Sequence, residues 1–230
     1  MPGKRISISM LDNRVRYLQI AFNYDLSLVR QLLPRIEYNS RILIEAGTPF
    51  LKLEGMDGIR QICRTWKGMV VADIKTNDGA VGEVAMASFA GATAATVLGN
   101  CPTETLNLFI AECSRRNMIS MIDMIGVEDP LAVMRPLAKP PDVVVIHRGR
   151  DEESTRGKAI KYKHINKIRS KFDVLISAAG GVDMHEARSA IFNGANIVVV
   201  NLVRPGDDWQ GISTGEDLRA VVNEYLTELG

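Results

Sequence analysis

The sequence has few cysteines, no long apolar run and almost no net charge, and each absence excludes a class of protein. Three cysteines are scattered over 230 residues without C-x-x-C spacing, which argues against a disulfide framework or a structural zinc site and fits a reducing cytoplasm. No apolar run approaches the roughly 18 residues of a membrane span, and no apolar segment follows the basic N-terminal residues as in a signal peptide. The net charge of +1 gives no field toward nucleic acid or an anionic membrane. We expect a cytoplasmic protein that binds neither.

Apolar segments of strand length alternate with helical segments along almost the whole chain. The expected strands are residues 17–23, 42–47, 69–73, 92–98, 118–123, 142–147, 173–177 and 196–200. The expected helices are residues 26–36, 52–66, 81–90, 102–116, 129–137, 162–171, 184–193 and 215–229. Eight strand–helix units without a linker predict an α/β fold, a single-domain (β/α)8 barrel over residues 17–230. Residues 1–16 would be a leader or a cap over one barrel end. A doubly wound open sheet is the alternative, but it usually has fewer strands.

Charged side chains end several of the predicted strands. Glu45, Asp73 with Lys75, Asp123 and His147 each follow a different apolar run. The active sites of (β/α)8 barrels lie at the C-terminal ends of the strands. Because these side chains would meet at one end of the barrel, we expect the site there. Asp73 and Lys75 are two residues apart and would leave an extended strand on the same face, although a strand end with an incidental ion pair has the same appearance.

The residue types suggest a chemistry. Glu45 and Asp73 offer the oxygen ligands that Mg²⁺ prefers, although two unrelated surface acids would look the same. His147 has an ordinary pKa suited to moving a proton near neutral pH, although a histidine at a strand end is as often structural. Gly180 and Gly181 precede a helix and can offer backbone N–H groups to an anion, or they can form a simple tight turn. Arg204 can add a phosphate contact, or it can be a solvated loop residue.

Other features have simpler interpretations. We expect His164 and His185 to lie on the surface, and Met118, Met121 and Met124 to pack in the core. A basic face is interpreted as a solvated helix because only Tyr162 could stack on a base. Its members are Lys158, Lys161, Lys163, Lys167, Arg169 and Lys171.

Several motifs together resemble one family. The run Asp73-x-Lys75-x-x-Asp78 resembles the D-x-K-x-x-D motif of the orotidine 5′-monophosphate decarboxylase superfamily. Leu18-Gln19-Ile20-Ala21, Ile44-Glu45-Ala46-Gly47-Thr48-Pro49 and His147-Arg148-Gly149-Arg150-Asp151 are similar to its sugar-phosphate branch. That branch holds 3-hexulose-6-phosphate synthase and 3-keto-L-gulonate-6-phosphate decarboxylase. The resemblance runs from about Tyr17 to Val200, most of the chain.

The resemblance implies a role for each matching residue. Glu45 and Asp73 would help to hold Mg²⁺, which stabilises an enediolate, Lys75 would lie beside the developing oxyanion, and His147 would move the proton. Asp78 would reach into the neighbouring active site of a homodimer. Three further residues, Ala179, Gly180 and Gly181, would hold the substrate's phosphate.

Three positions bear on the branch. Asp123 and Ala179 are typical of the synthase, whereas Arg150 is typical of the decarboxylase. Two positions depart from the family. Asn23 stands where the first strand ends in Asp, and a Gly-Arg pair after strand eight is replaced by a segment ending in Arg204.

We therefore expect a Mg²⁺-dependent aldehyde-lyase acting on a ketose phosphate, most simply D-ribulose 5-phosphate and formaldehyde. Its predicted catalytic residues are Lys75, Asp78, Asp123 and His147; its predicted substrate-binding residues are Asn23, Arg150, Ala179, Gly180, Gly181 and Arg204. The alternatives are a carboxy-lyase of the keto-gulonate phosphate kind and a non-catalytic sugar-phosphate-binding barrel, which Asn23 and the altered strand-eight segment suggest. Orotidine decarboxylation ranks lower because its motif has a lysine where this chain has Glu45.

Overall fold

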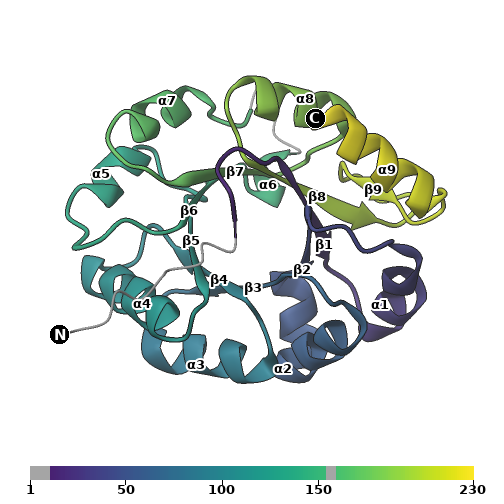
Figure 1. The fold of residues 1–230 in the computed structure, drawn as a ribbon, viewed down its shortest axis with the longest axis horizontal. Helices are drawn as coiled ribbons and strands as arrows, with labels where there is room; N and C mark the ends of the chain where they lie inside the picture. Colours follow the sequence, from purple (N-terminus) through teal and green to yellow (C-terminus); the bar gives the residue numbers. More distant parts are fainter. Residues whose placement is uncertain (1–10, 154–158) are drawn as a thin grey trace.

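The computed structural model describes residues 11–153 and 159–230, and it confirms the predicted (β/α)8 barrel. Neighbouring strands pair in parallel in chain order, and β1 pairs with β8, which closes the sheet (Figure 1). The strands are β1 (Tyr17–Phe22), β2 (Ile42–Ala46), β3 (Val70–Thr76), β4 (Ala94–Leu98), β5 (Ile119–Asp123), β6 (Val143–His147), β7 (Leu175–Ala179), β8 (Ile197–Val203) and a short β9 (Ile212–Ser213).

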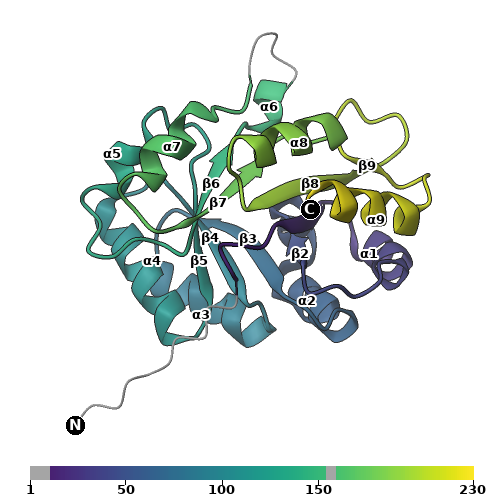
Figure 2. The same ribbon diagram turned by 45° about the horizontal axis from the view of Figure 1, so that its top comes forward.

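The helices form a ring outside the barrel, in which α9 lies between α8 and α1 (Figures 1 and 2). They are α1 (Leu26–Leu32), the 3-10 helix η1 (Leu33–Arg35), α2 (Thr48–Thr65), α3 (Ala80–Ala90), α4 (Thr103–Arg115), α5 (Pro130–Met134), α6 (Arg150–Glu153), α7 (Lys163–Arg169), α8 (Met184–Phe192) and α9 (Leu218–Glu228). Within the described part of the chain, none of them combines the length and the apolar character that crossing a bilayer requires.

Alternating side chains divide the core into two clusters. One cluster fills the space between strands and helices, as Leu18, Ile20 and Phe22 of β1 do. The other fills the barrel, where Ala21 packs with inward-facing residues of the other strands. Of the predicted cap, residues 1–10 lie outside the described residues, and Leu11 is buried against this inner cluster. The barrel is therefore packed solid below its mouth.

Several boundaries near the site differ from the prediction. Strand β3 runs to Thr76, beyond the predicted end at Asp73. Strand β8 continues through Leu202 and Val203, because these residues pair with β9, so most of the predicted strand-eight loop is strand. Strand β7 likewise extends to Ala179 rather than ending at Ser177. Helix α2 begins at Thr48, with Pro49 at its start, and Gly55 interrupts it with a φ of 58°. Two residues that line the pocket, Ala179 and Asn201, therefore belong to strands rather than to the loops after them.

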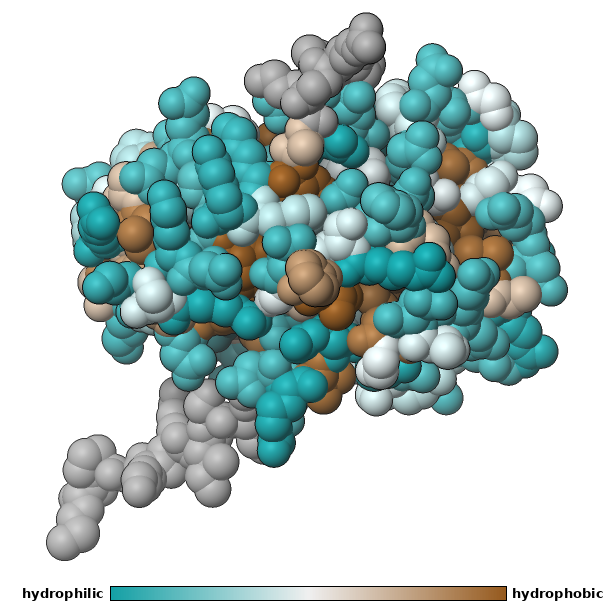
Figure 3. Space-filling view, turned by 90° about the horizontal axis from the view of Figure 1, so that it is seen from above, coloured by the Kyte–Doolittle hydropathy of each residue, from teal (hydrophilic) through white to brown (hydrophobic). Residues whose placement is uncertain are grey.

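Two predictions about the surface have different outcomes. We expect His164 on the surface, but it is only 7% exposed, because it lies on the buried face of α7 with Ile165 and Ile168. His185 is exposed as predicted. The predicted basic helix corresponds to α7, and the side of the barrel that carries α7 and α8 is largely hydrophilic (Figure 3); Lys158 lies outside the described residues. The three predicted core methionines are buried.

Candidate active site

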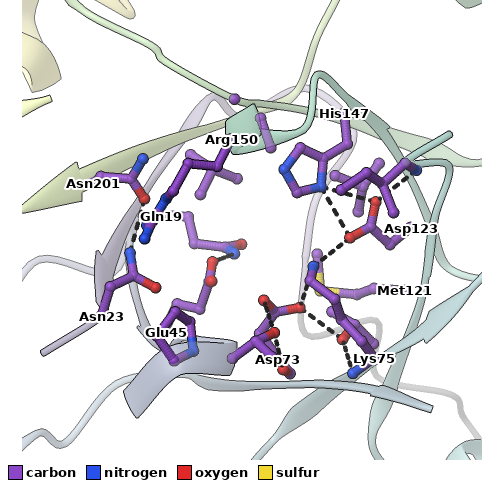
Figure 4. A pocket seen from close by; sticks show the side chains of 18 of the residues that line it. Gln19, Asn23, Glu45, Asp73, Lys75, Met121, Asp123, His147, Arg150 and Asn201 are labelled. Atoms are coloured by element: carbon purple, nitrogen blue, oxygen red, sulfur yellow. Dashed lines mark hydrogen bonds and ion pairs between the residues drawn. The ribbon is translucent and has the colours of Figure 1, made fainter. Parts of the chain in front are cut away.

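A cavity of about 480 Å³ opens at the C-terminal ends of the strands. It is lined by nine of the residues predicted for the site (Figure 4): Asn23, Glu45, Asp73, Lys75, Asp123, His147, Arg150, Ala179 and Gly180. They come from strands β1, β2, β3, β5, β6 and β7 or from the residues just after them. The convergence expected from the strand ends is thus present in the structure.

Lys75 lies between two carboxylates. Its Nζ is 3.1 Å from Asp73 Oδ1 and 2.5 Å from Asp123 Oδ2. Burial alone would lower the pKa of Lys75, but the negative charges of Asp73 and Asp123 outweigh it and raise that pKa above its ordinary value. Lys75 is therefore a cation at neutral pH.

Lys75 reaches this position through an irregular backbone rather than through simple strand alternation. The register of β3 against β4 shifts between Ala72 and Thr76, and Lys75 has a φ of 46°, in the left-handed region that non-glycine residues rarely adopt. The Lys75 backbone N–H donates to Thr96 Oγ1 at 3.0 Å, and that hydroxyl donates to Asp73 Oδ1 at 2.8 Å. A bulge of this kind re-aims a side chain next to an active site.

Asp123 joins Lys75 to His147. Nδ1 of His147 lies 2.9 Å from both carboxylate oxygens of Asp123, and the backbone N–H of Ile125 donates to Oδ1 at 3.0 Å. Burial would raise the pKa of Asp123, but the charges and hydrogen bonds of His147 and Lys75 lower it below its usual range. Conversely, burial would lower the pKa of His147, and the charge of Asp123 raises it overall. Because Nδ1 faces a carboxylate, it carries the ring proton, which leaves Nε2 to accept one.

Glu45 is the acid with the most unfavourable surroundings. It is buried, and its Oε2 accepts a 2.5 Å hydrogen bond from Gln19 Nε2. Burial and the nearby negative charge of Asp73 raise the pKa of Glu45 to about 7. Asp73 itself also accepts a hydrogen bond from the Thr48 hydroxyl, 2.8 Å from its Oδ2. The positive charge of Lys75 therefore does not fully offset the burial of Glu45 and its repulsion by Asp73.

These oxygens fit a Mg²⁺ ion. No group of three or more histidine, cysteine, aspartate or glutamate side chains in residues 11–153 and 159–230 is arranged to hold a metal, but Mg²⁺ usually takes one or two carboxylates and completes its shell with water and substrate. A cation would offset the repulsion that raises the pKa of Glu45. Gln19 Oε1 adds a buried oxygen without a hydrogen-bond partner in the described chain. Glu45 and Asp73 would thus hold the ion.

An asparagine pair forms the other side of the pocket. Asn23 Nδ2 donates to Asn201 Oδ1 at 2.9 Å, across the adjacent ends of β1 and β8. Asn23 lies so close over Gly47 that a Cβ there would be 2.1 Å from Asn23 Oδ1. Arg150 points into the pocket beside this pair, opposite His147 (Figure 4).

Three predicted residues do not line the pocket. Asp78 is exposed in the turn after β3. Gly181 faces Arg148, whose Nη2 donates to the carbonyls of Gly180 and Gly181 at 2.9 and 3.2 Å. The guanidinium of Arg204 lies over the ring of Tyr24, outside the pocket.

Seven polar or charged residues that line the pocket were not predicted as site residues. They are Gln19, Thr48, Lys52, Thr96, Asp151, Glu153 and Asn201. Gln19 and Thr96 are polar residues at inward-facing positions of otherwise apolar strands, and that break in pattern is the signal that could have found them. Thr48 belongs to the motif Ile44-Glu45-Ala46-Gly47-Thr48-Pro49, whereas Asn201 lies one residue beyond the predicted end of strand eight.

A closed parallel barrel with acids, a lysine and a histidine at its C-terminal mouth has the plan of a (β/α)8 enzyme. Residues 17–201 match the model of the orotidine 5′-phosphate decarboxylase / HUMPS family. The chain belongs to this family, as the motifs predicted, and it is accordingly an enzyme.

Relatives and solved structures agree. A bifunctional enzyme Fae/Hps of Methanothrix thermoacetophila is 35% identical over 93% of this chain and 52% of its own length. The chain thus spans about half the length of the curated relatives that it matches. The crystal structure of 3-hexulose-6-phosphate synthase from Salmonella typhimurium superposes with a TM-score of 0.80 at 25% identity, over 93% of this chain and 98% of the other. The KGPDC structure from Streptococcus mutans, at 15% identity over 94% of this chain and 97% of the other, has a TM-score of 0.68 and shows the shared fold.

Proposed function

We propose that the protein is a Mg²⁺-dependent aldehyde-lyase that joins D-ribulose 5-phosphate and formaldehyde, the 3-hexulose-6-phosphate synthase reaction. The observation that supports this most directly is the continuous network from Asp73 through Lys75 and Asp123 to His147. It brings a fixed cation and a base of raised pKa to one pocket. These are the groups needed to remove a proton beside a carbonyl and to stabilise the resulting oxyanion.

The first step is removal of a proton from C1 of the ketose phosphate. Nε2 of His147 accepts the proton, the C1–H electron pair forms a C1=C2 double bond, and the C2 carbonyl becomes an oxyanion. The charge of Asp123, 2.9 Å from Nδ1, stabilises the imidazolium that forms. His147 must be neutral to act, so the rate rises with pH through its raised pKa.

The developing oxyanion is stabilised by positive charge that is present before the reaction. Lys75 supplies one charge, and its two carboxylate partners hold it in place without a change in geometry. Glu45 and Asp73 would hold Mg²⁺, which would supply Lewis-acid stabilisation of the developing negative charge. In the second step the C1=C2 electron pair forms a bond from C1 to the formaldehyde carbon, and the C2 oxyanion becomes a carbonyl again. The formaldehyde oxygen takes the proton that His147 Nε2 removed in the first step.

A decarboxylase reaction on a 3-keto-L-gulonate phosphate is the second candidate. It would form the same kind of enediolate, by losing CO₂ instead of a proton. The observation in its favour is that Arg150, typical of that branch, lines the same pocket as His147. The buried Asp123, typical of the synthase, favours the first candidate.

We further propose that two copies assemble through α3 and α4. These neighbouring helices expose four apolar side chains: Val81, Met86, Phe89 and Leu108. Phe89 is 77% exposed, and large apolar side chains exposed on neighbouring helices favour association. Asp78, in the turn before α3, would then reach the partner's pocket. Light scattering should give a dimer mass for the protein and a monomer mass for Phe89→Glu; a monomer at every concentration would contradict the proposal.

The direct test is exchange of the C1 proton of D-ribulose 5-phosphate with D₂O, with Mg²⁺ or with EDTA, followed by addition of formaldehyde. Metal-dependent exchange and a hexulose phosphate product are expected. Exchange without product would favour the second candidate, and the keto-gulonate phosphate would be tested next. No exchange with either substrate would overturn the assignment as an enediolate-forming lyase.

A further inference from the structure

The geometry points to Arg150 as the group that binds the phosphate of the substrate, and to Trp209 as the residue that positions Arg150. This inference rests on the proposed function, which gives the substrate a phosphate. Neither role follows from the family motifs, in which the phosphate would be held by glycine amides and a strand-eight arginine.

Four basic side chains line the pocket: Lys52, Lys75, His147 and Arg150. Lys52 is exposed to solvent. Lys75 is engaged by Asp73 and Asp123, and His147 by Asp123. Arg150 lines the same pocket, and it makes no ion pair with an acid anywhere in residues 11–153 and 159–230. A guanidinium is suited to binding a phosphate through two parallel hydrogen bonds. Arg150 is therefore a cation available to an incoming anion.

The arginine nearest to the end of β8 is held elsewhere. Arg204 Nη2 lies 3.1 Å from Asp25 Oδ2, and the guanidinium carbon lies 4.4 Å from the centre of the Tyr24 ring. The side chain is 50% exposed and does not line the pocket. The segment after β8, where the family has its Gly-Arg pair, therefore supplies no arginine to the pocket of this chain.

The ring of Trp209 packs against the guanidinium of Arg150. The guanidinium carbon of Arg150 lies 4.0 Å from the centre of the Trp209 ring, within the range of a cation–π contact. Trp209 is half-buried and does not line the pocket itself. Since Arg150 follows β6 and Trp209 follows β8, this contact brings a cation from the β6 side of the barrel toward the end of β8.

The segment that carries Trp209 is anchored at both ends. Before Trp209, Asp207 accepts hydrogen bonds from the Tyr24 hydroxyl and from the backbone N–H of Arg204. After it, Gly211 packs so tightly on β8 that a Cβ would lie 2.2 Å from the carbonyl oxygen of Asn201. An aromatic ring on an anchored segment can fix a long side chain before the ligand arrives.

The position of Arg150 fits a ketose 5-phosphate. Arg150 shares the pocket lining with Ala179, Gly180 and Asn201, at the ends of β7 and β8, where barrels often bind phosphate. His147 lies on the opposite side (Figure 4). The reacting carbon C1 and the C5 phosphate are at opposite ends of the substrate, so both groups can be engaged at once.

The test compares ligands that differ only in phosphate. Calorimetry with Mg²⁺ present would measure binding of D-ribulose 5-phosphate, D-ribulose and inorganic phosphate to the protein and to Arg150→Ala, Trp209→Ala, Trp209→Phe and Arg204→Ala. We expect Arg150→Ala to weaken both phosphate-containing ligands about 10- to 100-fold, and Trp209→Ala about 3- to 10-fold, without affecting D-ribulose. Trp209→Phe should retain most of the affinity. In C1 exchange, Trp209→Ala should raise KM and leave kcat unchanged.

Other outcomes would contradict the role of Arg150, the role of Trp209 or the proposed substrate. If Arg150→Ala weakens D-ribulose as much as its phosphate, or if Arg204→Ala causes the loss instead, the phosphate role of Arg150 is wrong. If Trp209→Ala lowers kcat and the melting temperature without raising KM, its role is structural only. If the protein binds inorganic phosphate but not D-ribulose 5-phosphate, the proposed substrate fails, and the loss of phosphate binding in Arg150→Ala still decides this inference.

Discussion

The two sides of the pocket are built differently. The charged wall consists of Glu45, Asp73, Lys75, Asp123 and His147, whereas the amide wall consists of Asn23 and Asn201 (Figure 4). Every member of the charged wall has a hydrogen bond or ion pair to another side chain of the barrel. The two asparagines are neutral and bind each other.

This difference separates what the reaction requires from what can vary. The charges that move a proton and stabilise an oxyanion are interlocked, so changing one changes the pKa of its neighbours. The amide wall carries no charge, and a change there leaves that network in place. The amide wall is also where this chain departs from the family pattern, since Asn23 replaces an acid. Variation of substrate within the family is therefore expected on the amide side.

The largest effect is expected from the base. His147→Gln removes the group that accepts the C1 proton, and proton exchange should slow by about 100- to 10,000-fold. The rate is measured by loss of the C1 proton signal in D₂O. His185→Gln, on the exposed face of α8, is the matched control and should exchange at the normal rate. A normal rate in His147→Gln would assign the base to another residue.

A smaller effect, with a characteristic pH dependence, is expected from Asp123→Asn. Asp123 raises the pKa of His147, so its loss should move the rising limb of the pH–rate profile to lower pH. The imidazolium also loses its counter-charge, and the plateau rate should fall. Loss of the hydrogen bonds from Lys75 and His147 should lower the free energy of unfolding by about 1.5–3 kcal/mol. A profile with an unchanged midpoint would show that Asp123 does not control His147.

The charged wall could largely be predicted from the sequence, because acids and bases that end apolar strands must converge when parallel strands close into a barrel. The backbone conformation that directs the Lys75 side chain into the pocket could not be predicted. Simple alternation put Asp73 and Lys75 on one face, but a register shift and a left-handed backbone direct Lys75 inward. Thr96, the hydroxyl that supports this bulge, belongs to the next strand, so no local pattern around Lys75 reveals it.

The amide wall was harder to predict from the sequence, because Asn23 and Asn201 lie where β1 and β8 end and the end of β8 depends on its pairing with β9. Predicted strand eight stopped at Val200, which left Asn201 in a loop, whereas pairing with the distant β9 extends the strand. His164 shows the same limitation, since a polar residue in a basic helix is buried where α7 packs on the rest of the barrel. In both cases a contact between separated segments overrides the local sequence.

An intermediate effect on stability is expected from Glu45. Its pKa is raised from 4.5 to about 7, so between these values the folded protein holds a proton that the unfolded chain releases. The free energy of unfolding therefore falls as pH rises from about 4.5 to 7 and stays low above it. Glu45→Gln should be more stable than the unchanged protein at pH 8 by about 1–3 kcal/mol, and about equal to it at pH 4.

Denaturant titrations in EDTA at the two pH values would measure this difference, with the exposed Glu224→Gln as control. Adding Mg²⁺ at pH 8 should raise the melting temperature of the unchanged protein and not that of Glu45→Gln. If Mg²⁺ stabilises both equally, Glu45 is not one of its ligands.

The smallest effects are expected from single changes in the amide wall. Asn23→Asp removes the donor to Asn201, but the Asn201 amide can rotate and donate instead, so KM for D-ribulose 5-phosphate should change by less than about tenfold. Asn201→Asp should be similarly mild, because Asn23 Nδ2 can still donate. The double variant places two carboxylates together without a donor, and its loss should exceed the product of the single losses. Additive effects would mean that the two asparagines act separately. A non-additive cycle with normal C1 exchange at saturating substrate would show that the amide wall acts as one unit on binding, while the charged wall performs the reaction.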